Sequence, residues 1–207
     1  MIIHYLGVCY FHMKNDEIRQ QILTAAEARF RQYGYKKTGM IELAQDCDMS
    51  AANLYRHFEN KLDICAALAK LCLAEGEALL EQVVEDEQLS ANEKLIAFIS
   101  QQLHHTYHYF ESVPKIGELV EALTIKRPEV IESHRQHKLT LLKQLLLQGQ
   151  SSGAFVFDDV DETGDAIHSA TLLFYFPSTI SLYPLPIMEQ KLHHVGQLLL
   201  RSLQASN

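Results

Sequence analysis

The sequence predicts an all-α protein. Apolar residues recur at three- and four-residue spacings along almost the whole chain, and no alternating stretch is long enough to predict a strand. Glycine and proline are sparse, at 9 and 5 of 207 residues, and leucine is abundant. A hydrophobic content of 47% suffices for one core, or for one core and a small appended domain.

Residues 1–13 are apolar and contain no Lys or Arg. A signal peptide needs a positively charged start and a small-residue cleavage site, and this stretch is too short to span a membrane. We interpret residues 1–13 as an apolar arm or an over-extended start, residues 14–61 as a first domain and residues 62–207 as a second. Four scattered cysteines without metal-type spacing favour a reducing, cytoplasmic location with no membrane partner.

The first domain is expected to begin with a helix from Asp16 to Tyr33, which Gly34 ends as a C-terminal cap residue. Lys36 and Lys37 then place two ammonium groups beside the start of the next helix, which we expect Thr38 to cap. Ammonium groups and a helix N-terminus both favour a phosphate, although a plain solvated loop is the alternative.

Residues 38–61 predict a helix-turn-helix. The first helix should end near Cys47, Asp48 can adopt the left-handed turn conformation, and Ser50 should cap the second helix. Leu54 and Phe58 lie four residues apart and share a buried face. The opposite face starts with small side chains and continues with polar ones: Ala51, Ala52, Asn53, Tyr55, Arg56 and His57. Such a face suits insertion into a DNA major groove.

The segment from Leu54 to Lys61, with the sequence LYRHFENK, closely resembles the signature that closes the DNA-binding unit of the TetR family of transcriptional regulators. Further residues fit the same pattern at the right spacing: Phe30, Gly34, Thr38, Leu43, Ala44, Met49 and Ser50. The resemblance covers residues 16–65, and it departs from the family at Asp48, where the family usually has glycine.

This resemblance implies a regulator, most often a repressor, that binds double-stranded DNA at a palindromic operator and is released by a small-molecule ligand. It also implies a homodimer paired through the last two helices. We expect residues 50–57 to read bases and Thr38, Tyr55, His57 and Lys61 to hold phosphates. The complete predicted DNA-binding set is Lys36, Lys37, Thr38, Ser50, Ala51, Ala52, Asn53, Tyr55, Arg56, His57 and Lys61.

The net charge of −8 is divided unevenly along the chain. Residues 1–61 contain eight Lys or Arg and seven Asp or Glu, whereas residues 62–207 contain ten and nineteen. The acidic groups therefore belong to the second domain, and a local basic surface on the first can still bind phosphate.

The second domain is predicted to be helical throughout. The expected helices cover residues 61–85, 91–111, 114–125, 128–149, 161–176 and 187–203, with caps at Asn60, Ser90 and Asp161 and a short extended run at residues 154–157. The last two helices are apolar on more than one side, so we expect the second face to pack against a partner subunit.

Polar-tipped residues of the second domain are the candidates for a ligand site. We expect His104, Tyr107, His108, His168 and Tyr175 to contact a small molecule. His104 and His108 are four residues apart and could hold a metal, but no third ligand follows at a set spacing, so no metal or cofactor is expected. No catalytic motif occurs, so an enzyme is not predicted. Two alternatives stay open: a TetR-like regulator controlled by a protein partner instead of a ligand, and a helical enzyme.

Overall fold

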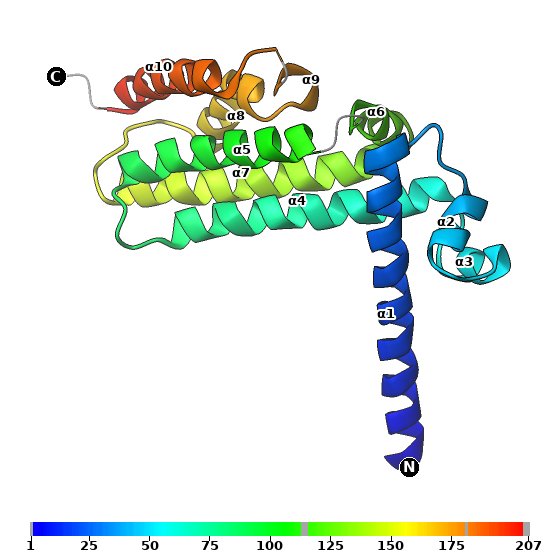
Figure 1. The fold of residues 1–207 in the computed structure, drawn as a ribbon. Coiled ribbons are helices and arrows are strands. Elements are labelled where there is room, and N and C mark those ends of the chain that lie inside the picture. Colours follow the sequence, from blue (N-terminus) through cyan, green and yellow to red (C-terminus); the bar gives the residue numbers. More distant parts are fainter. Residues whose placement is uncertain (1, 113–115, 181, 205–207) are drawn as a thin grey trace. The chain divides into compact units, whose positions relative to one another are not determined.

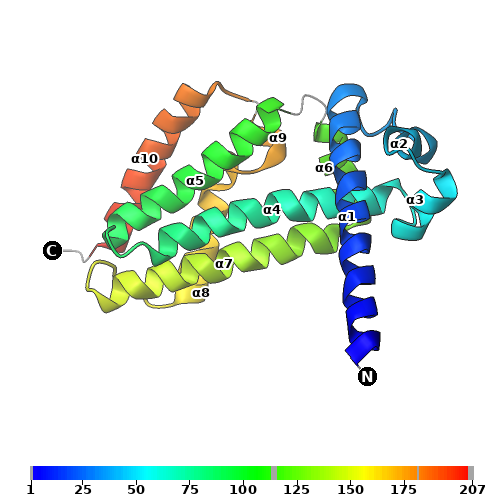
Figure 2. The same cartoon turned by 60° about the horizontal axis from the view of Figure 1, so that its bottom comes forward.

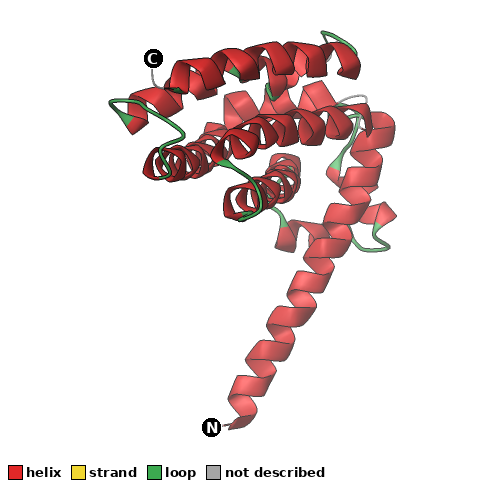
Figure 3. Ribbon diagram, turned by 90° about the vertical axis from the view of Figure 1, so that its left-hand side faces the viewer, coloured by secondary structure: helices red, strands yellow, loops and turns green. Residues whose placement is uncertain are grey.

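A computed structural model describes residues 2–112, 116–180 and 182–204, and these residues form helices joined by short loops (Figure 1). No strand occurs among them, which confirms the all-α prediction (Figure 3). The helices are α1 (Ile2–Tyr33), α2 (Met40–Asp46), α3 (Ala51–His57), α4 (Lys61–Glu85), α5 (Ala91–Ser112), α6 (Ile116–Lys126), α7 (Pro128–Ser151), α8 (Val160–Ala170), the short 3₁₀ helix η1 (Leu172–Phe174), α9 (Pro177–Ile180) and α10 (Leu185–Leu203). Within the described ranges, none of these helices combines the length and the apolar character that a membrane crossing requires.

The helices divide between two compact units. Unit 1 contains α1 to α3, the start of α4 as far as Lys70, and α6. Unit 2 contains the rest of α4, α5 and α7 to α10. Helix α6 lies in the stretch that was predicted to be the second domain, but it belongs to unit 1, where its Glu118 carboxylate accepts a hydrogen bond of 2.8 Å from the Lys36 backbone N–H.

Unit 1 has a small core made where α1, α2 and α3 pack together. The side chains at its centre are nearly inaccessible to solvent: Leu54 and Phe58, which were predicted to be buried, and Ile22, Ala26, Phe30 and Leu43. Cys47 and Cys65 are buried in the same unit as free thiols, and burial raises the pKa of Cys65 to about 12. The prediction that Leu54 and Phe58 share a buried face is therefore confirmed.

Unit 2 is a helical bundle in which α5 packs against both α7 and α10, and α8 packs against α7 (Figure 2). Its core is rich in leucine and phenylalanine, including the fully buried Leu103, Leu145, Phe155 and Phe174. The run from residue 154 to 157 contributes Phe155 to this core, and the backbone N–H of Val156 donates to the Leu203 carbonyl at 2.8 Å.

Several predicted caps are confirmed. Asn60 accepts from the Asp63 N–H at 3.1 Å, and Ser90 and Glu93 exchange the hydrogen bonds of a capping box. Gly34 has a positive φ of 89° at the end of α1, and Pro128 opens α7. The predicted helix start at Pro114 lies outside the described residues.

Other boundaries differ from the prediction. Thr38 does not cap α2, because its hydroxyl donates to the Gly34 carbonyl at 2.9 Å and Gly39 occupies the cap position. Asp159, not Asp161, caps α8, since its carboxylate accepts from the N–H of Asp161 at 2.7 Å and of Glu162 at 2.9 Å.

Two further helix limits also differ. The helix expected from residue 161 to 176 ends at Ala170, where the Thr171 hydroxyl bonds to the Ile167 carbonyl at 2.8 Å. Helix α1 extends back to Ile2 rather than starting at Asp16, and no proline interrupts the intervening residues. Whether residues 1–13 are an arm or an over-extended start stays a prediction.

Candidate nucleic-acid interface and ligand site

The turn between α2 and α3 has the predicted form. Asp48 adopts the left-handed conformation, with φ at 52°, and the N–H of Met49 donates to the Ala44 carbonyl at 2.9 Å. The Ser50 hydroxyl then accepts from the Asn53 N–H at 3.2 Å and caps α3. An aspartate thus provides the turn geometry that a glycine would adopt with less strain.

Helix α1 fixes the orientation of α2 and α3. The Arg19 guanidinium lies 4.1 Å from the centre of the Phe58 ring and donates to the His57 carbonyl at the end of α3. The Gln21 amide donates to the Cys47 carbonyl at 3.1 Å, and Arg29 forms a two-point ion pair with Asp46. Hydrogen bonding from Arg29 lowers the pKa of the Asp46 carboxyl. The roles of Arg19 and Gln21 were not predicted, because the position of a polar residue on a helix does not show which distant group it contacts.

The predicted reading face of α3 is open to solvent. Leu54 is buried beneath it, whereas Tyr55 is 50% exposed and Arg56 is also exposed. The predicted base-reading residues follow the same pattern: Ser50 and Ala52 are exposed, and Ala51, Asn53 and His57 are half-buried. Small side chains at the start of α3 and hydrogen-bonding tips beyond them therefore share one accessible surface.

His57 lies at the edge of this face. Its Nδ1 is buried and has no hydrogen-bond partner among the described residues. Desolvation lowers the pKa of the imidazole, and the nearby positive charges of Arg19 and Arg56 lower it further. Both effects favour the neutral form of the imidazole, so His57 is a weak source of positive charge on this face.

The loop from Gly34 to Gly39 exposes two of its predicted phosphate-binding residues to solvent and buries the third. Lys36 and Lys37 are exposed, and Lys36 Nζ lies 3.3 Å from a Glu121 carboxylate oxygen of α6. Thr38 is only 3% exposed and is bonded within the loop, so its side chain is not on the surface.

Lys61 is also used inside unit 1. Its ammonium donates to the backbone carbonyls of Tyr35 at 2.6 Å and Thr38 at 2.7 Å, and it lies 4.3 Å from the centre of the Tyr35 ring. Burial lowers the pKa of this lysine. The geometry supports a role for Lys61, the first residue of α4, in holding the loop between α1 and α2 through these two backbone carbonyls.

The five predicted ligand residues fall into two groups in unit 2. On α5, the rings of His104 and His108 stack at 6.3 Å; His104 bonds Glu189 of α10 at 2.8 Å, and His108 is exposed. Tyr107 of the same helix packs partly buried against the core. The second group is His168 and Tyr175. The Tyr175 hydroxyl donates to the His168 carbonyl at 2.8 Å and lies 2.9 Å from the His168 Nδ1. Among the described residues, no bond joins the two groups.

A buried lysine that is not among the predicted site residues lies beside the second group. Lys138 of α7 is 5% exposed, its Nζ donates to the Gln102 side-chain oxygen at 3.2 Å, and it lies 3.5 Å from the centre of the Tyr175 ring. Burial lowers the pKa of Lys138 to about 7. Periodicity alone could have shown that Lys138 is four residues before Leu142 on the apolar stripe of α7, which is an unusual place for a charge.

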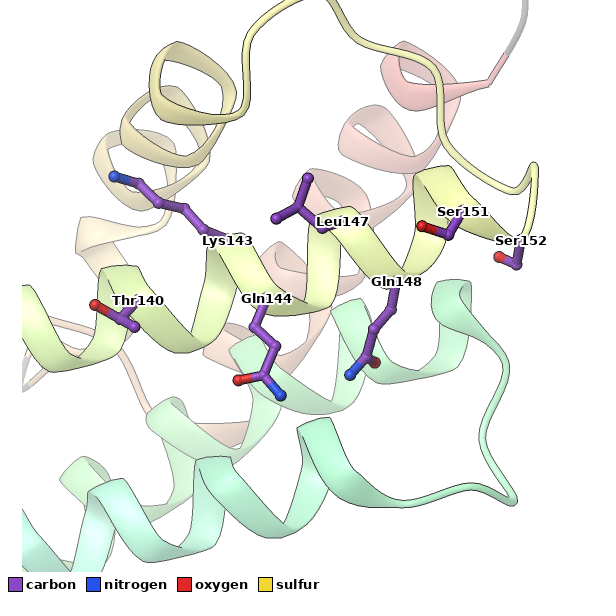
Figure 4. Close-up of a pocket in the computed structure, with 7 residues that line it drawn as sticks. All are labelled: Thr140, Lys143, Gln144, Leu147, Gln148, Ser151 and Ser152. Carbon is purple, nitrogen blue, oxygen red and sulfur yellow. The ribbon is translucent and has the colours of Figure 1, made fainter.

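The outer face of α7 carries a shallow groove of about 860 Å³ (Figure 4). The residues that line it are Thr140, Lys143, Gln144, Leu147, Gln148, Ser151 and Ser152, and none belongs to the predicted ligand set. In the close-up, Lys143 extends from one side of α7 and Gln144 and Gln148 extend from another. Across the described part of the chain, no group of three His, Cys, Asp or Glu side chains is arranged to hold a metal ion.

Comparison with known proteins gives matches over most of the chain. Residues 22–68 match the profile described as bacterial regulatory proteins, tetR family, and residues 91–195 match that of the tetracyclin repressor-like C-terminal domain. A search of curated proteins finds no match.

Many solved structures are similar. The TetR family transcriptional regulator PfmR from Thermus thermophilus is 26% identical, with a TM-score of 0.61 over 91% of this chain and 98% of that one. The fatty acid degradation regulator FadR from Bacillus halodurans is 19% identical, with a TM-score of 0.65 over 88% of this chain and 94% of that one. A putative tetR-family regulator from Mesorhizobium loti is 16% identical, with a TM-score of 0.73 over 92% and 98%.

Proposed function

This chain belongs to the TetR family of bacterial transcriptional regulators, and we propose that it is a repressor whose α3 helix reads a palindromic operator. The observation that supports this proposal is the open face of α3 on a turn locked by Ser50 and by contacts from α1. The bases would be contacted from Ser50, Ala51, Ala52, Asn53 and Arg56. Lys36, Lys37 and Tyr55 would contact phosphates, whereas Thr38 and Lys61 would act by shaping the loop beside them.

Release from DNA would follow from a small ligand bound in unit 2. Helix α4 runs without a break from Lys61 to Glu85 and contributes residues to both units. A ligand that favours one conformation of unit 2 could therefore change the population of DNA-competent molecules. A change in operator affinity on adding ligand distinguishes this proposal from control by a protein partner.

The DNA proposal is tested by a mobility-shift titration with the DNA that flanks the protein's own gene. The double variant Tyr55→Ala, Arg56→Ala should bind at least about tenfold more weakly, because each lost contact costs about 1 kcal/mol or more. Lys70→Ala is the matched control, since it removes an exposed charge of α4 outside the reading face. Equal affinity of the double variant and the wild type, with helix content unchanged by circular dichroism, would refute the assignment of α3.

A further inference from the structure

Lys138 is an ammonium group in the interior of unit 2 without an anionic contact. Among the described residues, no carboxylate oxygen lies within 4 Å of its Nζ, and its one oxygen partner is the neutral amide of Gln102 at 3.2 Å. Gln102 is itself buried, at 8% exposure, and the Tyr175 ring covers the ammonium from another side. Burying an unpaired charge is costly, so this lysine needs a purpose that a leucine at the same place would not serve.

The charged neighbours of Lys138 are occupied elsewhere. Glu77 of α4 acts on Lys138 electrostatically, but its carboxylate is bonded to His134 Nδ1 at 2.7 Å. Arg135 is held by Glu132 of its own helix through bonds of 2.7 and 2.9 Å. The His168 ring stacks on the Tyr175 ring at 5.2 Å, and its Nδ1 lies 2.9 Å from the Tyr175 hydroxyl.

The donors around this point match an anionic oxygen. An ammonium has three N–H donors, of which the structure assigns one to Gln102 among the described residues. A carboxylate is a stronger acceptor than an amide, and the resulting charge-assisted bond would remove the cost of the unpaired charge. The Tyr175 hydroxyl already donates its proton to the His168 carbonyl at 2.8 Å, so the Lys138 ammonium is the main donor for a carboxylate here.

We propose that unit 2 binds a small organic acid with a single carboxylate, which pairs with Lys138 beside Gln102, His168 and Tyr175. One buried ammonium balances one negative charge, whereas a phosphate monoester carries about −2 and would leave an unmatched charge inside the unit. The inference rests on the proposed function only for its regulatory meaning. Binding of the acid itself requires no DNA, so the two proposals can fail separately.

The test is a thermal-shift and calorimetric titration of the full-length protein without DNA. The probes are sodium butyrate, octanoate, laurate and benzoate, each compared with its primary amide at equal ionic strength. At least one acid should raise the melting temperature while its amide does not, because a ligand that binds only the folded state stabilises it. Lys138→Met should lower the affinity for that acid about tenfold or more, which is the effect expected for the loss of a charge-assisted hydrogen bond.

Lys143→Met is the matched control, because Lys143 lies on the same helix but is paired with Asp161 at the surface. This variant should bind the acid like the wild type. Equal stabilisation by acid and amide, full binding by Lys138→Met, or no effect of any acid in the series would each overturn the proposal.

A second measurement on the wild-type protein applies even where Lys138→Met does not fold. Pairing with a carboxylate favours the charged lysine, so acid binding at pH 8 should take up protons. Isothermal titrations in phosphate and in Tris would then differ in heat by an amount that reports this uptake. Identical heats, after correction for dilution, would contradict pairing at Lys138.

Discussion

Individual charged side chains in this protein owe their properties to burial as much as to their partners. Lys61 and Lys138 are both lysines with lowered pKa values, and in both cases desolvation is the largest cause. Lys61 is compensated by two backbone carbonyls, whereas Lys138 has a neutral amide and an aromatic ring. The first arrangement fixes a loop, and the second leaves an amine that has no anionic partner among the described residues.

Lys138 should make the stability of the protein depend on pH. Its folded pKa of about 7 lies below the usual 10.5, so above pH 7 the unfolded chain binds a proton that the folded chain does not. The free energy of unfolding therefore rises as the pH increases from 7 to about 8.5, and the rise is absent in Lys138→Met. Urea denaturation at pH 7.0, 7.75 and 8.5 measures it, with Lys143→Met as the control.

Other titrating groups act outside this window. Burial lowers the pKa of His134 and of His168 to about 4, so their contribution to stability rises from about pH 4 and is nearly complete at pH 7. Burial raises the pKa of Cys65 and of Tyr175, so these groups lower stability only above their usual pKa of 9.0 and 10.0. A flat wild-type profile from pH 7 to 8.5 would show that Lys138 is not buried as an unpaired amine.

Glu121 should weaken DNA binding, because its carboxylate lies 3.3 Å from Lys36 Nζ and competes with phosphate for that ammonium. Both side chains are exposed, so the effect is small and screened by salt. Glu121→Gln should tighten operator binding about two- to fourfold at low ionic strength and have no effect at high ionic strength. Fluorescence anisotropy at two salt concentrations checks this, with Glu87→Gln as a control; weaker binding by Glu121→Gln would contradict it.

At the scale of single elements, residue chemistry decided which helix ends could be predicted. Ser50, Asn60 and Ser90 cap the helices expected from their position, because each precedes a helix by one residue and bonds an N–H within it. Thr38 and Asp161 have the same chemistry, but Gly39 after Thr38 and Asp159 before Asp161 occupy the cap positions. Local sequence does not show which of two neighbouring polar residues will be turned inward, since tertiary packing makes that choice.

The same limit applies to the two sites. The face of α3 could be predicted because its small, polar and buried residues alternate with the period of one short helix. The pair of His168 and Tyr175 lies seven residues apart and was also within reach of the sequence. Lys138, Gln102 and Glu77 come from three helices far apart in the chain, and no local pattern brings them together.

Helix α7 requires a glycine near its C-terminal end. A Cβ added at Gly149 would lie 2.0 Å from the ring of Phe155, which is fully buried and cannot move away. Gly149→Ala should therefore destabilise the protein by about 1–3 kcal/mol. Gly117→Ala in α6 is the matched control, because a Cβ there meets no atom within 4 Å and alanine favours helix. Thermal unfolding of both variants measures the difference in stability. Equal melting temperatures for the two variants would refute the packing described for Phe155.

At the scale of the whole molecule, a dimer would present two DNA-binding units to the duplex and so compensate for the small positive charge of each unit. Residues 1–61 are near neutral while the rest of the chain is acidic, so a single DNA-binding unit has little electrostatic attraction for a duplex. Exposed apolar residues on the proposed dimer helices supply a means of pairing: Leu198 of α10 is 68% exposed, Ile187 of α10 is 41% exposed, and Ala166 and Ala170 of α8 are also accessible.

The dimer proposal predicts that Leu198→Asp separates the subunits, because it would place an unpaired carboxylate in an apolar interface. Light scattering after size-exclusion chromatography should give the mass of two chains for the wild type and of one chain, 23.6 kDa, for the variant. Gln197→Asp changes the neighbouring exposed residue of α10 and should leave the mass unchanged. A dimeric Leu198→Asp protein would place the interface elsewhere.

The buried thiols of unit 1 have a chemical consequence. Cys47 is 4% exposed at the end of α2, and burial together with Asp46 and Asp48 raises its pKa; Cys65 is fully covered in α4. The thiolate is the form that reacts with peroxides and alkylating agents, so both sulfurs are inert while the unit is folded. Oxidants and electrophiles can therefore reach these sulfurs only when the unit opens, and the rate of such damage is set by how often α2 or α4 detaches.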